Sequence, residues 1–316
     1  MATKKAASTK KATAKKPAAA KTTVRTVRAD AKPATTKTVA TKAVAVPAPA
    51  SGSKVQLPSN IVNIVLAELF GTFILTLVAL AATQDANALY VGIALALLVV
   101  GLGAISGTHI NPAVTFGLWT MRKLKTVLVP FYWGAQFLGA MLAVIVSNWV
   151  ANSSISLSFS SFAQFDWSVF GVELVATAVF LFGLAAVISR RELGAGARAL
   201  GIGASLAVGL VVGGTLLTAL KAQDVATYQK QYQANQGSAE KSNNPEIPHS
   251  AFVKSVTANP AVALAVTDNA ESALDSSSSN SKTNSRLTLE VIAGTLVGAA
   301  VGGNLYLLIA GRRKND

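Results

Sequence analysis

The sequence contains no cysteine and only two histidines, His109 and His249, among its 316 residues. Disulfides, thiolate metal sites and cysteine nucleophiles are therefore excluded, and two histidines leave little for a zinc or iron centre. The sequence also lacks a nucleophile paired with a base and a phosphate-binding loop. We therefore expect no enzymatic activity, no cofactor and no bound metal.

Charged residues are scarce as well, and their distribution is uneven. They make up 13% of the chain against 51% for hydrophobic residues, and the mean hydropathy of +0.46 is typical of membrane proteins. Residues 1–54 hold 13 of the 28 basic residues but one of the 14 acidic ones, so they carry +12 of the net charge of +14. We interpret residues 1–57 as a disordered basic tail, because they lack large apolar side chains and any signal-peptide core.

Apolar segments of bilayer length follow this tail. The six segments cover about residues 60–82, 89–105, 128–150, 170–189, 199–220 and 287–310. The connections at 121–125 and 189–198 and the C-terminal residues 312–316 are basic, so the positive-inside rule places them and both chain ends in the cytoplasm. The sequence thus predicts an all-α, multi-pass cell-membrane protein with a polar extracellular insertion at about 221–257.

Two further apolar segments are too short to cross the bilayer and carry the same tripeptide. Asn111-Pro112-Ala113 follows the second span, and Asn259-Pro260-Ala261 precedes the sixth. Proline removes a backbone donor and is best tolerated in the first turn of a helix, so each tripeptide predicts the start of a half-helix. Asparagine is also a good helix cap, and we interpret each asparagine as both a cap and a donor that faces a pore.

The spans divide into two units of three, at about residues 58–150 and 168–311. The first span of each unit carries a glutamate, Glu68 or Glu173, and each unit contains one Asn-Pro-Ala tripeptide. Because three is odd, the second unit must cross the membrane in the opposite direction, and inverted repeats with broken helices are typical of transport proteins. We therefore expect the half-helices to enter from opposite sides and to meet beside a water-filled path.

The sequence resembles the aquaporin, or major intrinsic protein, family over about residues 58–311. The resemblance lies in the paired tripeptides, the glutamates of the first and fourth spans, SGTHINPAVT (Ser106–Thr115) and AQFLGA (Ala135–Ala140). It implies a homotetramer of six-helix subunits, each with two re-entrant half-helices and a pore for water or small uncharged solutes such as glycerol. It also implies that Glu68 and Glu173 brace the re-entrant loops by accepting backbone N–H groups.

Other site residues remain to be assigned around the two tripeptides. The non-helical backbone before each break exposes carbonyl groups, and we expect the following to line the pore: Gly107, Thr108, His109, Thr257 and Ala258. His109 has no second metal ligand nearby, which favours this backbone role over metal binding, and Gln136 is expected to hydrogen-bond the same loop. A proton relay is the alternative for Glu68 and Glu173. Neither glutamate has an evident basic partner, which favours bracing.

The sequence departs from the family pattern directly after the second tripeptide. Relatives have arginine there, which forms the narrow outer filter, whereas this chain has Val262. Spacing from the first tripeptide points to Val91 as the filter residue of the second span, and Leu210 or Gly209 corresponds to it in the fifth. Such a filter lacks a donor and a positive charge, so strict water selectivity is in doubt and a less polar constriction is expected.

A second function stays open on the sequence alone. The chain would then be a poorly conducting membrane anchor whose basic residues 1–54 bind nucleic acid or anionic lipid. A solvated tail without any partner explains the same charge. Deletion of residues 2–54 separates these functions, because a channel keeps its osmotic permeability without the tail.

Overall fold

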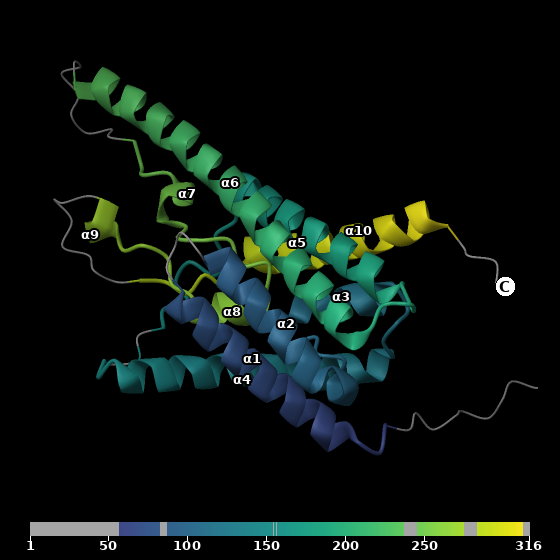
Figure 1. Cartoon of the computed structure of the whole chain (residues 1–316). Helices are drawn as coiled ribbons and strands as arrows, with labels where there is room; N and C mark the ends of the chain where they lie inside the picture. The colour runs from purple at the N-terminus through teal and green to yellow at the C-terminus, as the bar shows by residue number, and fades with distance from the viewer. Residues whose placement is uncertain are drawn as a thin grey trace, which may run out of the picture. The chain divides into compact units, whose positions relative to one another are not determined.

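The computed structural model describes residues 57–82, 87–153, 155, 157–236, 245–274 and 283–311. The C-terminal residues 312–316, and all of the expected tail at residues 1–57 except Leu57, lie outside the described residues. The described part of the chain folds into helices and, apart from two isolated bridges, contains no β pairing (Figure 1).

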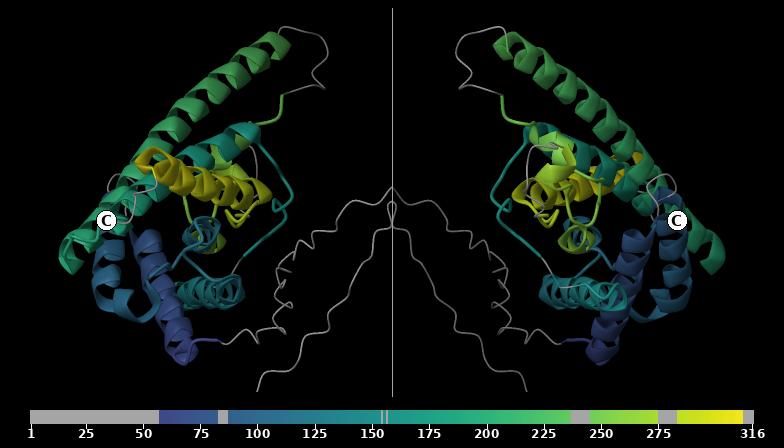
Figure 2. Two further views of the ribbon diagram at one scale, coloured as in Figure 1. Left: turned by 90° about the vertical axis from the view of Figure 1, so that its right-hand side faces the viewer. Right: turned by 90° about the vertical axis from the view of Figure 1, so that its left-hand side faces the viewer.

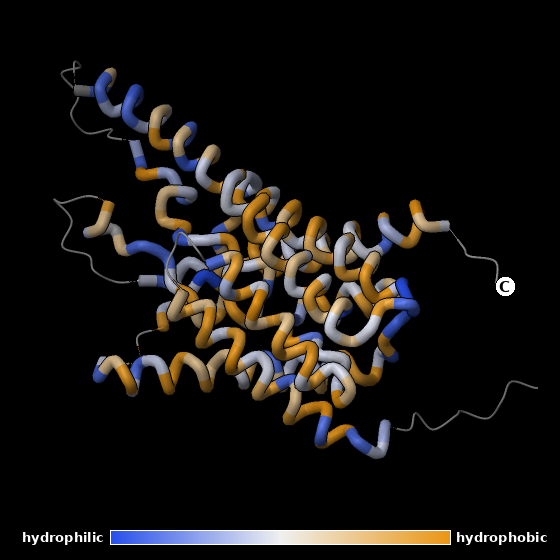
Figure 3. Tube along the Cα trace, in the orientation of Figure 1, coloured by the Kyte–Doolittle hydropathy of each residue, from blue (hydrophilic) through white to orange (hydrophobic). Residues whose placement is uncertain are grey.

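Six of the described helices are long and apolar enough to cross a membrane. They are α1 (Ile61–Ala81), α2 (Asn87–Ser106), α4 (Val129–Val150), α5 (Trp167–Ile188), α6 (Ala195–Gln236) and α10 (Leu289–Ala310). Figure 3 shows apolar residues along all of them, and the protein is an all-α integral membrane protein, as predicted. Except for α6, each helix agrees with a predicted span to within three residues at either end.

Helix α6 is longer than the sequence suggested. The predicted span ends at Leu220, but the helix continues through the polar residues beyond it to Gln236 (Figure 1). Residues 221–236 contain no glycine or proline and are rich in alanine, lysine and glutamine, which are good helix formers. Tyr228 and Tyr232 also stack one turn apart, with ring centroids 6.0 Å from each other. Hydropathy therefore predicted where the apolar segment ends, and not where the helix ends.

Glycines set the closest contacts between the long helices. On α10 they form a row facing α5, and an added Cβ at Gly294, Gly298 or Gly302 would press on the carbonyl oxygens of, in turn, Phe170, Leu174 and Ala178. Because the contacts advance by four residues on both helices, α5 and α10 run in parallel. Gly92 of α2 and Gly203 of α6 meet in the same way, each against the other's carbonyl oxygen. Small residues at such crossings are typical of membrane helix packing.

Two short helices begin at the repeated tripeptides, and the long helices enclose them (Figure 2). They are α3 (Pro112–Thr120) and α8 (Pro260–Ala265). Of the long helices, α3 packs most against α10, whereas α8 packs most against α4, so each short helix lies against the last long helix of the other unit. This exchange holds the tripeptides of both units in the interior. Two single-turn helices, α7 (His249–Phe252) and α9 (Glu271–Leu274), flank α8 in the sequence, and a 3-10 turn (Thr126–Leu128) precedes α4.

Candidate functional site: two opposed asparagines and an adjoining cavity

Helices α3 and α8 begin with the same capping geometry. Asn111 Oδ1 accepts the backbone N–H of Ala113 at 2.8 Å, and Asn259 Oδ1 accepts that of Ala261 at 3.0 Å. Both asparagines have extended backbone, and proline fills the first helical position, where its missing donor costs least. Each asparagine is therefore a helix cap, which is one of the two roles expected of it.

The amide nitrogens of these asparagines connect the two short helices. Asn111 Nδ2 donates to the carbonyl oxygen of Ala258 at 2.8 Å, and Asn259 Nδ2 donates to that of Ile110 at 3.1 Å. Each acceptor directly precedes the other asparagine, so the two contacts are equivalent under the repeat. Because a carboxamide has two N–H donors, each asparagine retains one beyond this contact.

Backbone strain occurs at the same two positions. Ile110 and Ala258 have φ angles of +40° and +49°, in the left-handed region that residues with a side chain rarely adopt. Each such residue costs about 1–3 kcal/mol, so the surrounding contacts must hold it in place. The strained conformation turns each carbonyl toward the asparagine of the opposite helix.

The carboxylate of Glu68 holds the loop before α3. It accepts the backbone N–H groups of His109 at 2.9 Å and Ile110 at 2.6 Å. It also accepts the Ser106 hydroxyl at 2.7 Å and the Gln136 amide at 2.8 Å, and it is fully buried. The structure thus places Glu68 at the loop that the resemblance implies it braces, with four neutral donors around one carboxylate. Gln136 does not hydrogen-bond the loop itself and instead donates to Glu68 and to Thr115 of α3.

Glu173 occupies the matching position before α8. Its carboxylate accepts the backbone N–H groups of Thr257 at 3.1 Å and Ala258 at 3.0 Å. The expectation that it has no basic partner is wrong, because Arg286 Nη2 lies 3.7 Å from Glu173 Oε1. The sequence did not indicate this contact, since the two residues are more than 100 positions apart. A charged neighbour makes Glu173 an ion-pair partner as well as a brace.

Arg286 is the largest fully buried side chain among the described residues. Besides Glu173, its guanidinium lies 3.0 Å from Glu290 and 3.6 Å from Asp268, and His249 Nε2 lies 2.9 Å from Glu290. We call these five residues the Arg286 cluster. One signal in the sequence was available, because Arg286 and Glu290 are four residues apart at the start of the last span.

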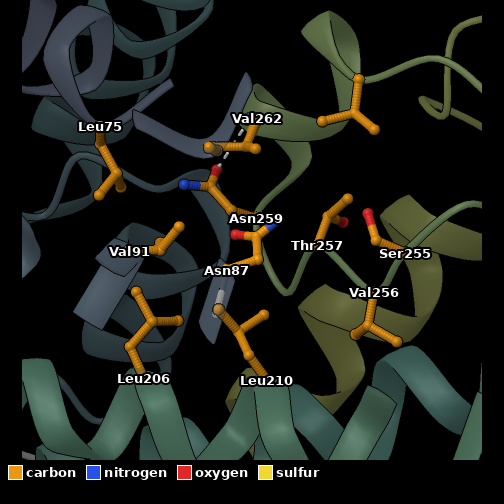
Figure 4. Close-up of a pocket in the computed structure, with 12 residues that line it drawn as sticks. Leu75, Asn87, Val91, Leu206, Leu210, Ser255, Val256, Thr257, Asn259 and Val262 are labelled. Carbon is orange, nitrogen blue, oxygen red and sulfur yellow. Dashed lines mark hydrogen bonds between the residues drawn. The ribbon is translucent and has the colours of Figure 1, made fainter. Parts of the chain in front are cut away.

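A cavity opens beside the second tripeptide (Figure 4). The space in which the centre of a water molecule can move is about 30 Å³, whereas roughly 10–15 Å³ suffices for one water. Its walls come from α1 (Leu75, Ala79), α2 (Asn87, Val91), α6 (Leu206, Leu210) and the chain around α8 (Ser255, Val256, Thr257, Asn259, Val262, Val266). The cavity therefore has room for a small solute directly beside one of the two asparagines.

Three of the predicted filter residues line this cavity together. They are Val91, Leu210 and Val262, and each comes from a different element (Figure 4). Gly209, the alternative to Leu210, instead faces α5, where an added Cβ would lie 2.6 Å from the carbonyl oxygen of Ala176. The sequence analysis did not identify the polar lining residues Asn87 and Ser255. Asn87 is four residues before Val91 and Ser255 is four residues before Asn259, both of which it did identify.

Of the five residues whose carbonyl groups were predicted to line the pore, one is on the cavity wall and four are not. Thr257 is on the cavity wall, but the wall does not include Gly107, Thr108, His109 or Ala258. The imidazole of His109 is buried, stacks on Tyr132 with ring centroids 4.3 Å apart, and lies 3.2 Å from the Thr115 hydroxyl. A pore role for the carbonyl groups before α3 stays a prediction.

Comparison with known proteins relates the first half of this site to one family. Residues 82–221 match the model of the family Major intrinsic protein. Aquaporin NIP2-3 of Zea mays is 31% identical over 166 residues, which cover 49% of this chain and 53% of that protein. Aquaporin TIP2-1 of Arabidopsis thaliana is 36% identical over 123 residues, which cover 38% of this chain and 47% of that protein. The chain spans about half the length of the curated relatives it matches.

Solved structures give a more distant likeness. The X-ray structure of the aquaglyceroporin from Plasmodium falciparum aligns with 78% of this chain and 95% of its own, with 19% identity and a TM-score of 0.45. The family match ends at Lys221, so it includes Asn111 but not Asn259. The assignment of the second tripeptide therefore depends on the reciprocal contacts between α3 and α8.

Proposed function

We propose that the chain belongs to the major intrinsic protein, or aquaporin, family, whose model matches residues 82–221, and that it is a passive transmembrane channel for water, for small uncharged solutes such as glycerol, or for both. The observation that carries this proposal is the reciprocal contact of Asn111 and Asn259 beside a cavity of solute size. Members of this family are channels and not enzymes, so the proposal assigns the protein no enzymatic activity.

In this proposal the two asparagines form the centre of the pore. Each side-chain oxygen is held by its own helix and one N–H by the opposite loop, so the orientation of the remaining N–H is fixed. A neutral solute that accepts this N–H and donates to a nearby carbonyl replaces the hydrogen bonds that it leaves in water. An ion loses far more hydration free energy than a neutral solute when it leaves water, and among the described residues no charged side chain lines the cavity to compensate for this loss.

Stopped-flow light scattering on proteoliposomes tests the channel function directly. The wild type is expected to speed equilibration of water, glycerol or both over protein-free liposomes. Asn111→Asp keeps the capping oxygen but removes the amide donor and adds a charge, so it should abolish this increase. Asn148→Asp is the matched control, since the Asn148 side chain bonds to Val144 of α4 and to Ser153 just beyond it and is not on the cavity wall. Wild-type liposomes no more permeable than empty ones would contradict the proposal.

We place Val91, Leu210 and Val262 at the narrow outer filter. Water that passes aliphatic walls loses hydrogen bonds without replacement, whereas the carbon face of glycerol meets a compatible surface. Val262→Arg should therefore lower the glycerol permeability relative to that of water. Val262→Met adds similar length without charge, so a drop limited to the arginine variant identifies a polar effect rather than a steric one. Equal ratios in wild type and Val262→Arg would remove Val262 from the filter.

The orientation and assembly are also proposals. We infer from the basic connections that both chain ends are cytoplasmic and that the segment from Lys221 to Lys254 is outside. External protease on intact cells should then cut between these two lysines and spare residues 1–57 and 311–316. Membership of the family implies a homotetramer. Native mass spectrometry in lipid nanodiscs can measure the number of subunits.

The alternative function, a poorly conducting anchor, depends on residues 1–54 and their charge of +12. Anionic lipid and nucleic acid are the partners that this charge favours. Deletion of residues 2–54 should leave solute permeability unchanged if the channel function holds. Vesicles with and without phosphatidylserine, and a duplex DNA probe, measure whether the deletion removes polyanion binding.

A further inference from the structure

The wall of the cavity is divided by chemistry. Eight of its twelve lining residues are aliphatic, and they come mainly from α1, α2, α6 and α8. The polar ones are Asn87, Ser255, Thr257 and Asn259. A pocket with apolar walls and a few convergent polar groups fixes the orientation of what enters it.

Two of these polar side chains are already engaged. The Thr257 hydroxyl lies 3.3 Å from the Glu173 carboxylate, and Asn259 caps α8 and bonds to Ile110. The side chains of Asn87 and Ser255, in contrast, make no hydrogen bond with any other described residue, and both are partly exposed. Within the described part of the chain, nothing occupies the hydrogen-bonding groups of these two side chains.

The positions of Asn87 and Ser255 relate them to the filter. Asn87 is the first residue of α2 and lies one turn before Val91, so both residues are on the same face of that helix. Ser255 belongs to the segment that leads into α8, four residues before Asn259. In Figure 4 the Asn87 carboxamide projects into the space ringed by Val91, Leu210 and Thr257. Polar groups from two separate elements thus converge beside the aliphatic filter.

We propose that Asn87, assisted by Ser255, is a specificity-determining residue of this pore and selects neutral solutes that both donate and accept hydrogen bonds, namely small polyols and urea-like amides. The inference rests on the proposed channel function. A carboxamide donates two N–H groups and accepts through its oxygen, so it can satisfy both roles of a hydroxyl or an amide. The arginine that relatives carry at the filter only donates and bears a charge.

The proposal also explains how a solute crosses an aliphatic constriction. A polyol has several hydroxyl groups that need partners at the same depth, and Asn259 alone offers one remaining N–H. Asn87 and Ser255 add a donor and an acceptor on the side of the cavity that holds Asn259, while the aliphatic wall opposite contacts the carbon chain of the polyol. Water is small enough to use Asn259 by itself, so it depends less on Asn87.

Permeability ratios of purified Asn87 variants in proteoliposomes test the assignment. Asn87→Leu keeps the volume and removes both polar groups, and it should lower glycerol and urea permeability about 2- to 10-fold, the effect of one neutral hydrogen bond, while water changes less. Asn87→Gln keeps the carboxamide and should restore part of the loss. Ser255→Ala should act in the same direction with a smaller effect. Asn148→Leu, outside the cavity, should leave all three permeabilities unchanged.

The outcomes separate this inference from the channel function. If the wild type conducts and Asn87→Leu leaves the glycerol-to-water and urea-to-water ratios unchanged, the inference is wrong and the channel function stands. An equal loss of all three permeabilities, without rescue by Asn87→Gln, indicates a structural defect and also overturns it. If the wild type itself conducts nothing, the channel function fails and the inference fails with it.

Discussion

Replacement of Arg286 by methionine should strongly destabilise the protein. Methionine keeps most of the aliphatic length but leaves the carboxylates of Glu173, Asp268 and Glu290 buried without the guanidinium that lies 3.0–3.7 Å from them. Removal of one partner from a buried ion pair costs about 3–5 kcal/mol. Because Arg286 is fully buried and serves three carboxylates, we expect a loss in the free energy of unfolding near 5 kcal/mol, at the upper end of that range.

The measurement is equilibrium unfolding in mixed micelles with a rising mole fraction of dodecyl sulfate, followed by fluorescence of the four tryptophans. Arg190→Met is the matched control, since Arg190 and Glu192 lie 3.5 Å apart with 60% and 58% of their side chains exposed. Exposed pairs contribute about 0–1 kcal/mol. Arg286→Lys should fall between the two, because lysine keeps the charge but not the planar fork of donors. Similar small losses for Arg286→Met and Arg190→Met would refute the reasoning.

Three other variants test the helix packing and the segment around His249. Gly302→Ala should destabilise by about 1–3 kcal/mol, because its Cβ would press on the Ala178 carbonyl oxygen, whereas Gly101→Ala, with open space around it, should stabilise by about 0.5–1 kcal/mol. Equal effects in unfolding experiments would contradict the close approach. The hydrogen bond to Glu290 raises the pKa of His249 above 6.5, so the stability from this contact is full below pH 6.5 and is lost as the pH rises through the raised pKa. Wild type and His249→Gln should therefore converge in unfolding free energy at alkaline pH, and a gap that is constant with pH would exclude this titration. The other charged groups facing His249 are Asp268, which also favours its protonation, and Arg286, which opposes it.

The short helices were predictable because their signals are local. Pro112 and Pro260 each follow an asparagine, and that dipeptide determines where the helix begins and which side chain caps it. The buried glutamates stood out because ionisable residues are rare within apolar spans, and the family resemblance then implied their bracing role. Counting from Asn111 pointed to Val91, which lies on the cavity wall, and no insertion separates the two residues.

The remaining features depend on contacts that the sequence order does not reveal. The Arg286 cluster joins residues from α5, α7, α10 and the loops between them, and apart from the four-residue spacing of Arg286 and Glu290 no spacing rule relates them. The end of α6 was missed because hydropathy reports the environment of a helix and not its length. Asn87 was missed for a different reason. A single asparagine at the start of an apolar span is typical of a helix terminus, and its place in the cavity becomes evident only when the residues across the cavity are known.

The two units balance their buried glutamates in different ways. Glu68 is surrounded by neutral donors from Ser106, Gln136 and the backbone, whereas Glu173 has fewer neutral donors and lies beside Arg286. The same second unit has Val262 where the family resemblance predicts the filter arginine. The buried guanidinium of Arg286 lies next to Glu173 instead and is not on the cavity wall. A guanidinium in that buried position can neutralise Glu173 and steady the loop before α8 without meeting the solute. In the proposed channel, this separation allows an aliphatic filter at Val262 while the loop that carries Asn259 keeps a charged anchor.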